Sequence, residues 1–392
     1  MYLARNIFLN PLPGKAGWPI EGPGPLTEVL GFGSNPGNLR MFVFVPARLQ
    51  HPRPLVVVLH GCGQTAASYG LGAGWPTLAE HYGFALLLAQ QRPSNNPRCC
   101  FNWYNSDDIA PGQGEACSIR QMVERMTRDN GIDPRRVFVT GLSAGGSMAS
   151  VMLAAYPEVF AAGAVIAGLP FGVAGNVREA LSVMRAGSGR PAAELGDLVR
   201  DASMHRGPFP KVSVWHGSAD RVVSPANAAE IVKQWLDVHR LPPAPMSEAV
   251  VEGYPRQIWW NAGGETVVES YIITDMAHGT PLGVAEDDTH YGRKGAFLLE
   301  AGISSSYHIA KFFGLTGWIG WIGDARPAAP ASPVKAVSPR PADAASDRAG
   351  EARGQAPARE RGTQKAAPSR RPRLVGVRAV IRRALTGAKS VK

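Results

Sequence analysis

Short apolar runs alternate with longer amphipathic stretches along the first 315 residues. Runs rich in Val, Leu, Phe and Ile occupy residues 41–45, 55–59, 84–88, 137–139, 164–166, 212–215 and 270–273. Continuous apolar runs of this length are typical of strands that are buried on both faces, as in a parallel sheet. The sequence therefore predicts a sheet of several strands at the centre of one domain.

Helical spacing appears between these runs. Ile119, Met122, Val123 and Met126 recur at i, i+3, i+4 and i+7, and the pair Asn130-Gly131 supplies a stop. Similar stretches lie at about 147–156, 226–239 and 304–313. Alternation of strands and helices predicts an α/β fold, with a doubly wound, mostly parallel sheet and helices on both faces. Residues 167–209 are rich in Gly, Pro and Arg, and we interpret them as turns that form an insertion over the carboxyl edge of the sheet.

The composition changes after residue 323. From there the chain is mainly Ala, Pro and Arg, with too few aliphatic residues to form a core, so we expect disorder to about residue 371. Residues 372–388 differ, because Leu374, Val377, Ile381 and Leu385 share one helical face beside several arginines. This pattern predicts a basic amphipathic helix. The predicted organisation is a leader (1–24), a domain (25–318) and a tail (319–392).

The formal charge of the whole chain is +10, and its positive excess lies in the tail. Residues 325–392 contain 16 Lys and Arg against 4 Asp and Glu, which leaves about −2 for the rest of the chain. We therefore expect no specific nucleic-acid partner and assign to the tail any contact with anionic surfaces. The alternative is that the chain is mainly a surface-binding protein that acts through this tail. The first residues lack the pattern of a secretion signal, so a cytoplasmic location stays open as an alternative.

Four cysteines, Cys62, Cys99, Cys100 and Cys117, all lie in the first third of the chain. They are too few for a disulfide framework and lack the paired spacing of metal ligands. We expect neither a metal site nor a cofactor.

The candidate chemistry begins at the pentapeptide 141–145, Gly-Leu-Ser-Ala-Gly, which places Ser143 between a strand and a helix. Small residues permit the sharp turn that lifts a nucleophilic serine above a sheet, as in α/β-hydrolases. We predict Ser143 as the nucleophile and the N–H of Ala144 as one oxyanion donor. Glycines flank Cys62 directly after the run 55–59, and its N–H is predicted as the second donor.

The acid and the base of such an enzyme follow the nucleophile in the order acid, then base. Asp220 lies just after the run 212–215, and His278 lies on a Gly-flanked loop after the run 270–273. We predict that His278 takes the proton of Ser143 and that Asp220 orients the imidazole.

Several blocks together resemble the poly(3-hydroxybutyrate) depolymerase family of esterases, type 1 catalytic domain, over roughly residues 25–318. The blocks are residues 59–66, 100–104, 140–146, 215–220 and 276–279. The resemblance implies an α/β-hydrolase that cleaves short-chain hydroxyalkanoate esters without a cofactor, through Ser143, Asp220 and His278. The family is also similar to feruloyl and acetylxylan esterases, which supply the alternative substrate class.

The resemblance further implies an extracellular location and a disulfide between Cys62 and Cys100; two free thiols are the alternative in a reducing compartment. Phe101 stands where the family usually has tryptophan, which bears on substrate preference. Trp103 and Tyr104 are candidate walls of the substrate site, with core packing as the alternative. Acyl transfer and peptide hydrolysis use the same triad, so the sequence leaves them open.

Overall fold

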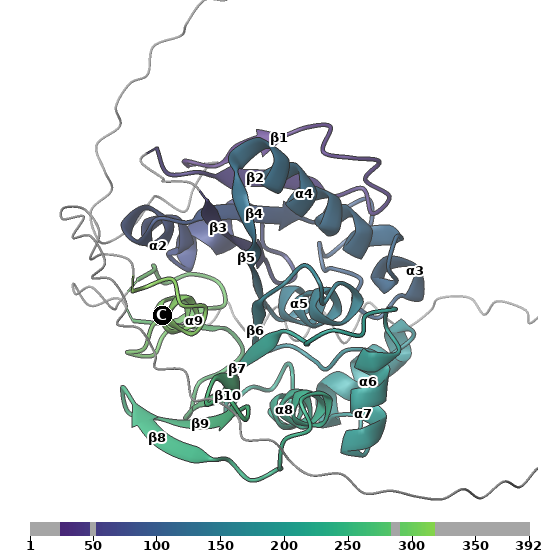
Figure 1. The fold of residues 1–392 in the computed structure, drawn as a ribbon, viewed down its shortest axis with the longest axis vertical. Helices are drawn as coiled ribbons and strands as arrows, with labels where there is room; N and C mark the ends of the chain where they lie inside the picture. The colour runs from purple at the N-terminus through teal and green to yellow at the C-terminus, as the bar shows by residue number, and fades with distance from the viewer. Residues whose placement is uncertain (1–23, 48–51, 284–290, 318–392) are drawn as a thin grey trace, which may run out of the picture. The chain divides into compact units, whose positions relative to one another are not determined.

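A ten-stranded sheet runs through the centre of the protein (Figure 1). The computed structural model describes residues 24–47, 52–283 and 291–317. The strand order in the sheet is β1-β2-β4-β3-β5-β6-β7-β10-β9-β8. These strands are β1 (Thr27–Val29), β2 (Arg40–Phe44), β3 (Arg53–Leu59), β4 (Ala85–Gln90), β5 (Ile132–Leu142), β6 (Ala162–Ile166), β7 (Lys211–Gly217), β8 (Ser247–Val251), β9 (Tyr254–Trp260) and β10 (Thr266–Ile273).

The six central strands, from β4 to β10, pair in parallel, whereas β1 and β2 at one side and β9 and β8 at the other pair antiparallel. A separate parallel pair joins β11 (Thr280–Leu282) to β12 (Leu298–Glu300). The predicted mostly parallel sheet is confirmed. Because the central strands share one direction, their carboxyl ends meet at a single edge, where the loops can bring distant residues together.

Helices cover both faces of the sheet, as the alternating runs predict. In β3, Leu55, Val57 and Leu59 join the core under one layer of helices, and Val56 and Val58 join the core under the other. Helices α4, α5 and α8 lie on one side of the sheet, and α2 and α9 lie on the other (Figure 1). The helices are α1 (Ala66–Gly72), α2 (Trp75–Tyr82), α3 (Ser106–Ile109), α4 (Gly114–Asn130), α5 (Ala144–Ala155), α6 (Val177–Ala186), α7 (Ala192–Arg200), α8 (Ala226–Val238) and α9 (Ser305–Phe312).

The interpretation of residues 167–209 as turns is wrong, because much of this segment folds into α6 and α7. Leu195 and Val199 lie one helical turn apart and are fully buried, so packing stabilises a short helix that Gly196 would weaken in isolation. The placement over the carboxyl edge holds for only part of the segment. The carbonyl of Met184 accepts a hydrogen bond from the N–H of Ser224, after the end of β7, but residues 200–209 reach the opposite edge.

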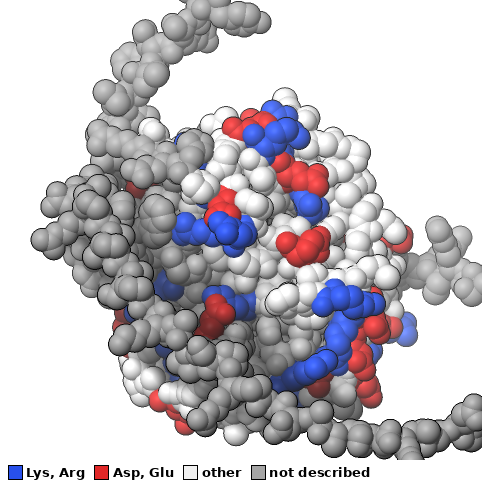
Figure 2. All heavy atoms as spheres, viewed as in Figure 1, with Lys and Arg blue, Asp and Glu red and all other residues white. Residues whose placement is uncertain are grey.

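Basic and acidic side chains lie next to one another on the face seen in Figure 2. Two ion pairs of the described residues are examples of such neighbours. Arg40 contacts Glu28 at 2.7 Å, and Arg200 contacts Asp237 at 2.6 Å. Partly exposed pairs of this kind contribute little to stability.

Most of the predicted leader, and the predicted tail from residue 319 with its helix at 372–388, lie outside the described residues. Within the part of the chain that the structure describes, no helix combines the length and the apolar character needed to cross a membrane.

Candidate active site

Ser143 occupies the turn between β5 and α5. Its backbone has φ 56° and ψ −118°, a strained conformation for a non-glycine residue that costs on the order of 1–3 kcal/mol. A Cβ atom at Gly145 would lie 2.2 Å from the carbonyl oxygen of Leu59, and one at Gly141 would lie 2.4 Å from the backbone of Gly145. The turn is therefore possible only with glycine at these two positions.

Loops from three neighbouring parts of the sheet bring three polar side chains together. His278 lies after β10 and Asp220 after β7, and these two strands pair in parallel. Nε2 of His278 lies 2.9 Å from Oγ of Ser143, and Nδ1 lies 2.6 Å from Oδ2 of Asp220. These partners assign Nδ1 as the donor to the carboxylate and Nε2 as the acceptor of the serine proton. The three residues selected from the sequence thus form one hydrogen-bonded chain.

Asp220 is buried, yet it is held in its charged form. Oδ1 accepts hydrogen bonds from the N–H groups of Val222, at 2.8 Å, and Val223, at 2.9 Å. Burial alone would raise the pKa of Asp220, but hydrogen bonds from His216 and His278 hold it well below its usual range. The carboxylate is consequently a fixed negative charge beside the imidazole of His278.

Two neighbours of the hydrogen-bonded chain were not predicted from the sequence. Nε2 of His216 lies 3.3 Å from Oδ2 of Asp220 and 2.9 Å from the carbonyl oxygen of Val223. The ring of Phe297 stands edge-on to His278, with 5.8 Å between ring centres. The position of His216, at the end of β7 and four residues before Asp220, was a usable signal, whereas the sequence around Phe297 offered none.

The predicted oxyanion donors are the backbone N–H groups of Cys62 and Ala144. Cys62 lies in the loop after β3, and Ala144 is the first residue of α5. Among the residues that the structure describes, neither N–H group has a hydrogen-bond acceptor. The first N–H groups of a helix lack partners within the helix and favour negative charge. Both groups are thus available to a ligand that carries a negative oxygen.

Buried side chains hold the loop that carries Cys62. Nδ1 of His60 donates to the carbonyl of Gly61 at 2.8 Å, and Nε2 accepts from the N–H of Gln91 at 3.1 Å. Burial lowers the pKa of His60 to about 4, so its ring is neutral at pH 7. Oε1 of Gln64 accepts from the N–H of Gly61 at 2.9 Å. His60 thus has a structural role, because both of its ring nitrogens bind backbone groups.

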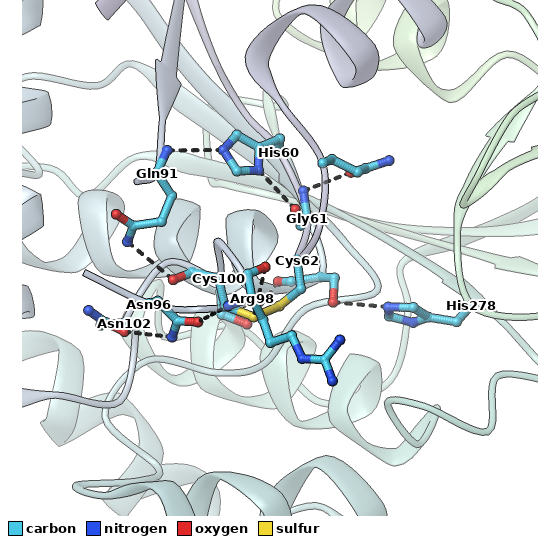
Figure 3. Close-up of a disulfide and its surroundings, with 12 residues drawn as sticks. His60, Gly61, Cys62, Gln91, Asn96, Arg98, Cys100, Asn102 and His278 are labelled. Atoms are coloured by element: carbon cyan, nitrogen blue, oxygen red, sulfur yellow. Dashed lines mark hydrogen bonds between the residues drawn. A yellow bond between two sulfur atoms is a disulfide. The ribbon is translucent and has the colours of Figure 1, made fainter. Parts of the chain in front are cut away.

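A disulfide joins Cys62 to Cys100, the pairing that the family resemblance implies (Figure 3). The N–H of Gly63 also donates to the carbonyl of Arg98 at 2.7 Å, so covalent and hydrogen bonds link the same two loops. The neighbouring Cys99 has a free thiol.

Glu115 of α4 holds the loop that carries Cys100 through hydrogen bonds. Its carboxylate accepts hydrogen bonds from the backbone N–H and from Nδ2 of Asn102, each at 2.8 Å, and from Nε2 of Gln91. Gln91 in turn donates to the carbonyl of Cys100 at 3.1 Å. Burial, and then the negative charge of Asp108, raise the pKa of Glu115 to about 8, although the three donors oppose this shift.

The candidate substrate walls differ in exposure. Trp103 is buried, with 6% of its surface exposed, whereas Tyr104 is only partly buried and stands edge-on to it. Phe101, at the position where the family usually has tryptophan, is fully buried and lies 5.0 Å from the ring of His60. Tyr104 therefore has a larger exposed fraction than Trp103.

A hollow of about 950 Å³ lies away from the candidate active site, at the edge of the sheet where strands β5, β6 and β7 begin. Arginines and phenylalanines line it, and it contains none of Ser143, Asp220 and His278. Within the described residues, no three His, Cys, Asp or Glu side chains are grouped to hold a metal ion.

Comparison with known proteins gives consistent matches. Residues 40–246 match the family described as Esterase PHB depolymerase. The chain is 46% identical over 293 residues to poly(3-hydroxyalkanoate) depolymerase C of Paucimonas lemoignei, covering 74% of this chain and 70% of the relative. It is 34% identical over 265 residues to an acetylxylan esterase of Coprinopsis cinerea, covering 66% of this chain and 70% of the relative.

Among solved structures, the acetyl xylan esterase from Aspergillus awamori superposes with a TM-score of 0.62 at 25% sequence identity. The match covers 74% of this chain and 99% of that one. The likeness in three dimensions therefore extends over the whole of that esterase and confirms the α/β-hydrolase fold.

Proposed function

The chain belongs to the PHB depolymerase family of esterases and is a carboxylic ester hydrolase, and on that premise we propose that Ser143, His278 and Asp220 are its catalytic triad. The observation that carries this proposal is the unbroken hydrogen-bonded chain from Oγ of Ser143, through the imidazole of His278, to the carboxylate of Asp220. Geometry of this kind recurs around serine nucleophiles on unrelated folds, and it supports this assignment.

The reaction proceeds in two halves. Oγ of Ser143 attacks the acyl carbon while Nε2 of His278 takes its proton, and the carbonyl oxygen becomes an oxyanion. The intermediate collapses, the alcohol leaves with the proton from His278, and the acyl group remains on Ser143. Water then attacks this acyl-enzyme and gives one proton to His278. When the acid is released, His278 returns that proton to Oγ of Ser143, and the enzyme regains its starting state.

The N–H groups of Cys62 and Ala144 stabilise the oxyanion. Both are fixed before the substrate arrives, one by the disulfide loop and the other by the start of α5. A pre-organised donor of this type contributes about 3–4 kcal/mol to stabilisation of the transition state. Asp220 stabilises the imidazolium that forms on His278, because its carboxylate keeps its charge in the buried site.

The proposed substrates are esters of short 3-hydroxyalkanoic acids, as oligomers or polymer. The higher identity to poly(3-hydroxyalkanoate) depolymerase C, 46% against 34% for the acetylxylan esterase, supports this choice. Acetylxylan and feruloyl esters form the alternative class. We also place the protein outside the cytoplasm, since a structural disulfide persists in an oxidising compartment. Recovery of the protein only from the cytoplasmic fraction of its source cells would contradict that placement.

An ester panel with matched serine variants tests the proposal. We expect Ser143→Ala to lower hydrolysis of p-nitrophenyl butyrate by up to about a millionfold, the loss known for serine triads. Ser150→Ala, a buried serine on α5, the helix that follows Ser143, is the control and should keep its activity. The panel then compares hydroxybutyrate oligomers, solid polymer, acetylated xylan and feruloyl esters. Turnover by purified Ser143→Ala would refute the nucleophile, and a preference for xylan or feruloyl esters would refute the substrate class.

A further inference from the structure

Phe297 adopts a backbone conformation that its residue type disfavours. It lies in the tight turn between Gly295 and Leu298, whose backbones exchange hydrogen bonds of 3.2 and 3.0 Å. Its φ of 61° falls in the left-handed region, where a side chain costs about 1–2 kcal/mol relative to glycine. Such a residue persists only where its surroundings hold it, and strain of this kind gathers at functional sites.

Two contacts hold this turn against the candidate active site. The carbonyl of Phe297 accepts a hydrogen bond of 2.8 Å from the N–H of Thr280, two residues after His278. The carbonyl of Ala296 accepts one of 3.0 Å from Nε2 of Gln64. Gln64 is the same side chain that binds the N–H of Gly61, so it ties the turn to the loop of Cys62. The turn is thus fixed both to the segment that follows His278 and to the loop that carries Cys62.

The ring of Phe297 lies beside the ring of His278. It stands at 76° to the imidazole of His278, with 5.8 Å between ring centres, and it is partly exposed. In ester cleavage His278 donates its proton to the departing alcohol, so the alcohol oxygen must come within about 3 Å of Nε2. Whatever is attached to that oxygen then lies next to the side chains that surround His278.

We propose that Phe297 is a specificity-determining residue, which forms a wall of the subsite for the alcohol part of the ester. This inference rests on the proposed triad. Filling the core alone would not require a phenylalanine with a strained backbone beside His278. An apolar wall at this place favours alcohols with apolar surface. The acyl part of the ester lies on the other side of the scissile bond and is not expected to sense Phe297.

The test varies the alcohol and the acyl group separately. One series holds butyrate constant and changes the alcohol from methanol to hexanol to p-nitrophenol, and the other holds p-nitrophenol constant and changes the acyl chain. For Phe297→Ala we expect kcat/KM to fall at least tenfold for the hexyl and p-nitrophenyl esters and less than threefold for the methyl ester. The order of preference along the acyl series should remain that of the wild type.

Two further variants separate recognition from folding. Phe297→Gly removes the ring and also relieves the left-handed strain, so it should lose the same selectivity without a lower melting temperature than Phe297→Ala. Phe209→Ala is the control, because Phe209 is also a partly buried phenylalanine but lines the distant hollow. An equal loss on all alcohols in both Phe297 variants would overturn the inference while leaving the triad intact. A wild-type protein that hydrolyses none of the esters would overturn the proposed function and the inference with it.

Discussion

Asp220 and His278, which are 58 residues apart in the chain, meet through a hydrogen bond of 2.6 Å between Oδ2 and Nδ1. The carboxylate also receives two backbone N–H groups and a weaker contact from His216. This set of donors keeps Asp220 ionised in a buried position and fixes the imidazole with Nε2 toward Ser143. The orientation of the His278 imidazole thus depends on one carboxylate.

We expect Asp220→Asn to reduce kcat for p-nitrophenyl butyrate by about 10⁴-fold, because an amide in this place favours the wrong tautomer of His278. KM should change little, since the amide occupies the same volume. Asp237→Asn is the control, because that carboxylate pairs with Arg200 away from the triad. A kcat within tenfold of the wild type in Asp220→Asn would show that the carboxylate does not orient the base.

Much of the scaffold could be predicted because buried strands and helices have apolar runs or regularly spaced apolar residues in the sequence. The apolar runs of β3, β4 and β5 and the spacing of Ile119 and Met126 in α4 identify elements that lie in the core. The hairpin β8–β9 was missed, since its strands are exposed or only partly buried and lack a run of buried residues. Helices α6 and α7 were missed because they are short and depend on packing against α8 and its surroundings.

The candidate site likewise contains residues that could be predicted from the sequence and contacts that could not. Ser143, Asp220 and His278 could be selected because each follows a strand, and strand order determines which loops share an edge. The contact of Gln64 with Ala296 could not be predicted, because it joins positions 232 residues apart through one loop conformation. The left-handed φ of Phe297 is likewise invisible in a sequence that has phenylalanine at that position.

Glu115 should make stability depend on pH. Its pKa is about 8 in the folded protein against an ordinary 4.5, so between these values the folded state keeps a proton that the unfolded chain has lost. The free energy of unfolding should therefore fall as pH rises from about 5 to 8, by at most about 1.4 kcal/mol per pH unit from this group. Below about pH 4.5 the contribution is complete.

Glu115→Gln removes this titration. Denaturant unfolding at pH 5, 6.5 and 8 should show a shallower decline for the variant than for the wild type, whatever its stability at any one pH. Glu124→Gln, an exposed position on the same helix, is the control. Parallel curves for wild type and Glu115→Gln would mean that Glu115 is ionised throughout this range.

Gly145→Ala should disrupt the turn that presents Ser143. The added methyl would meet the carbonyl oxygens of Leu59 and His60 at 2.2 and 2.5 Å, and these atoms belong to backbone that cannot move independently. We expect a loss of stability of more than about 3 kcal/mol, as for severe overpacking, together with loss of ester hydrolysis. Gly175→Ala is the control, because its nearest neighbour would be 3.6 Å away. Equal melting temperatures for the two variants would contradict the steric argument.

The two adjacent cysteines allow the disulfide to be tested with little other change. Cys100 bonds to Cys62 across 38 residues, whereas Cys99 is free. Cys100→Ser should lower the free energy of unfolding by about 2–4 kcal/mol, because the unfolded chain regains the freedom that the bond removed. It should also lower kcat, because the loop that presents the N–H of Cys62 is then held by hydrogen bonds alone. Cys99→Ser should change neither quantity, and treatment with dithiothreitol should make the wild type behave like Cys100→Ser. If Cys100→Ser kept full activity but lost stability, the bond would serve the fold and not the oxyanion donor.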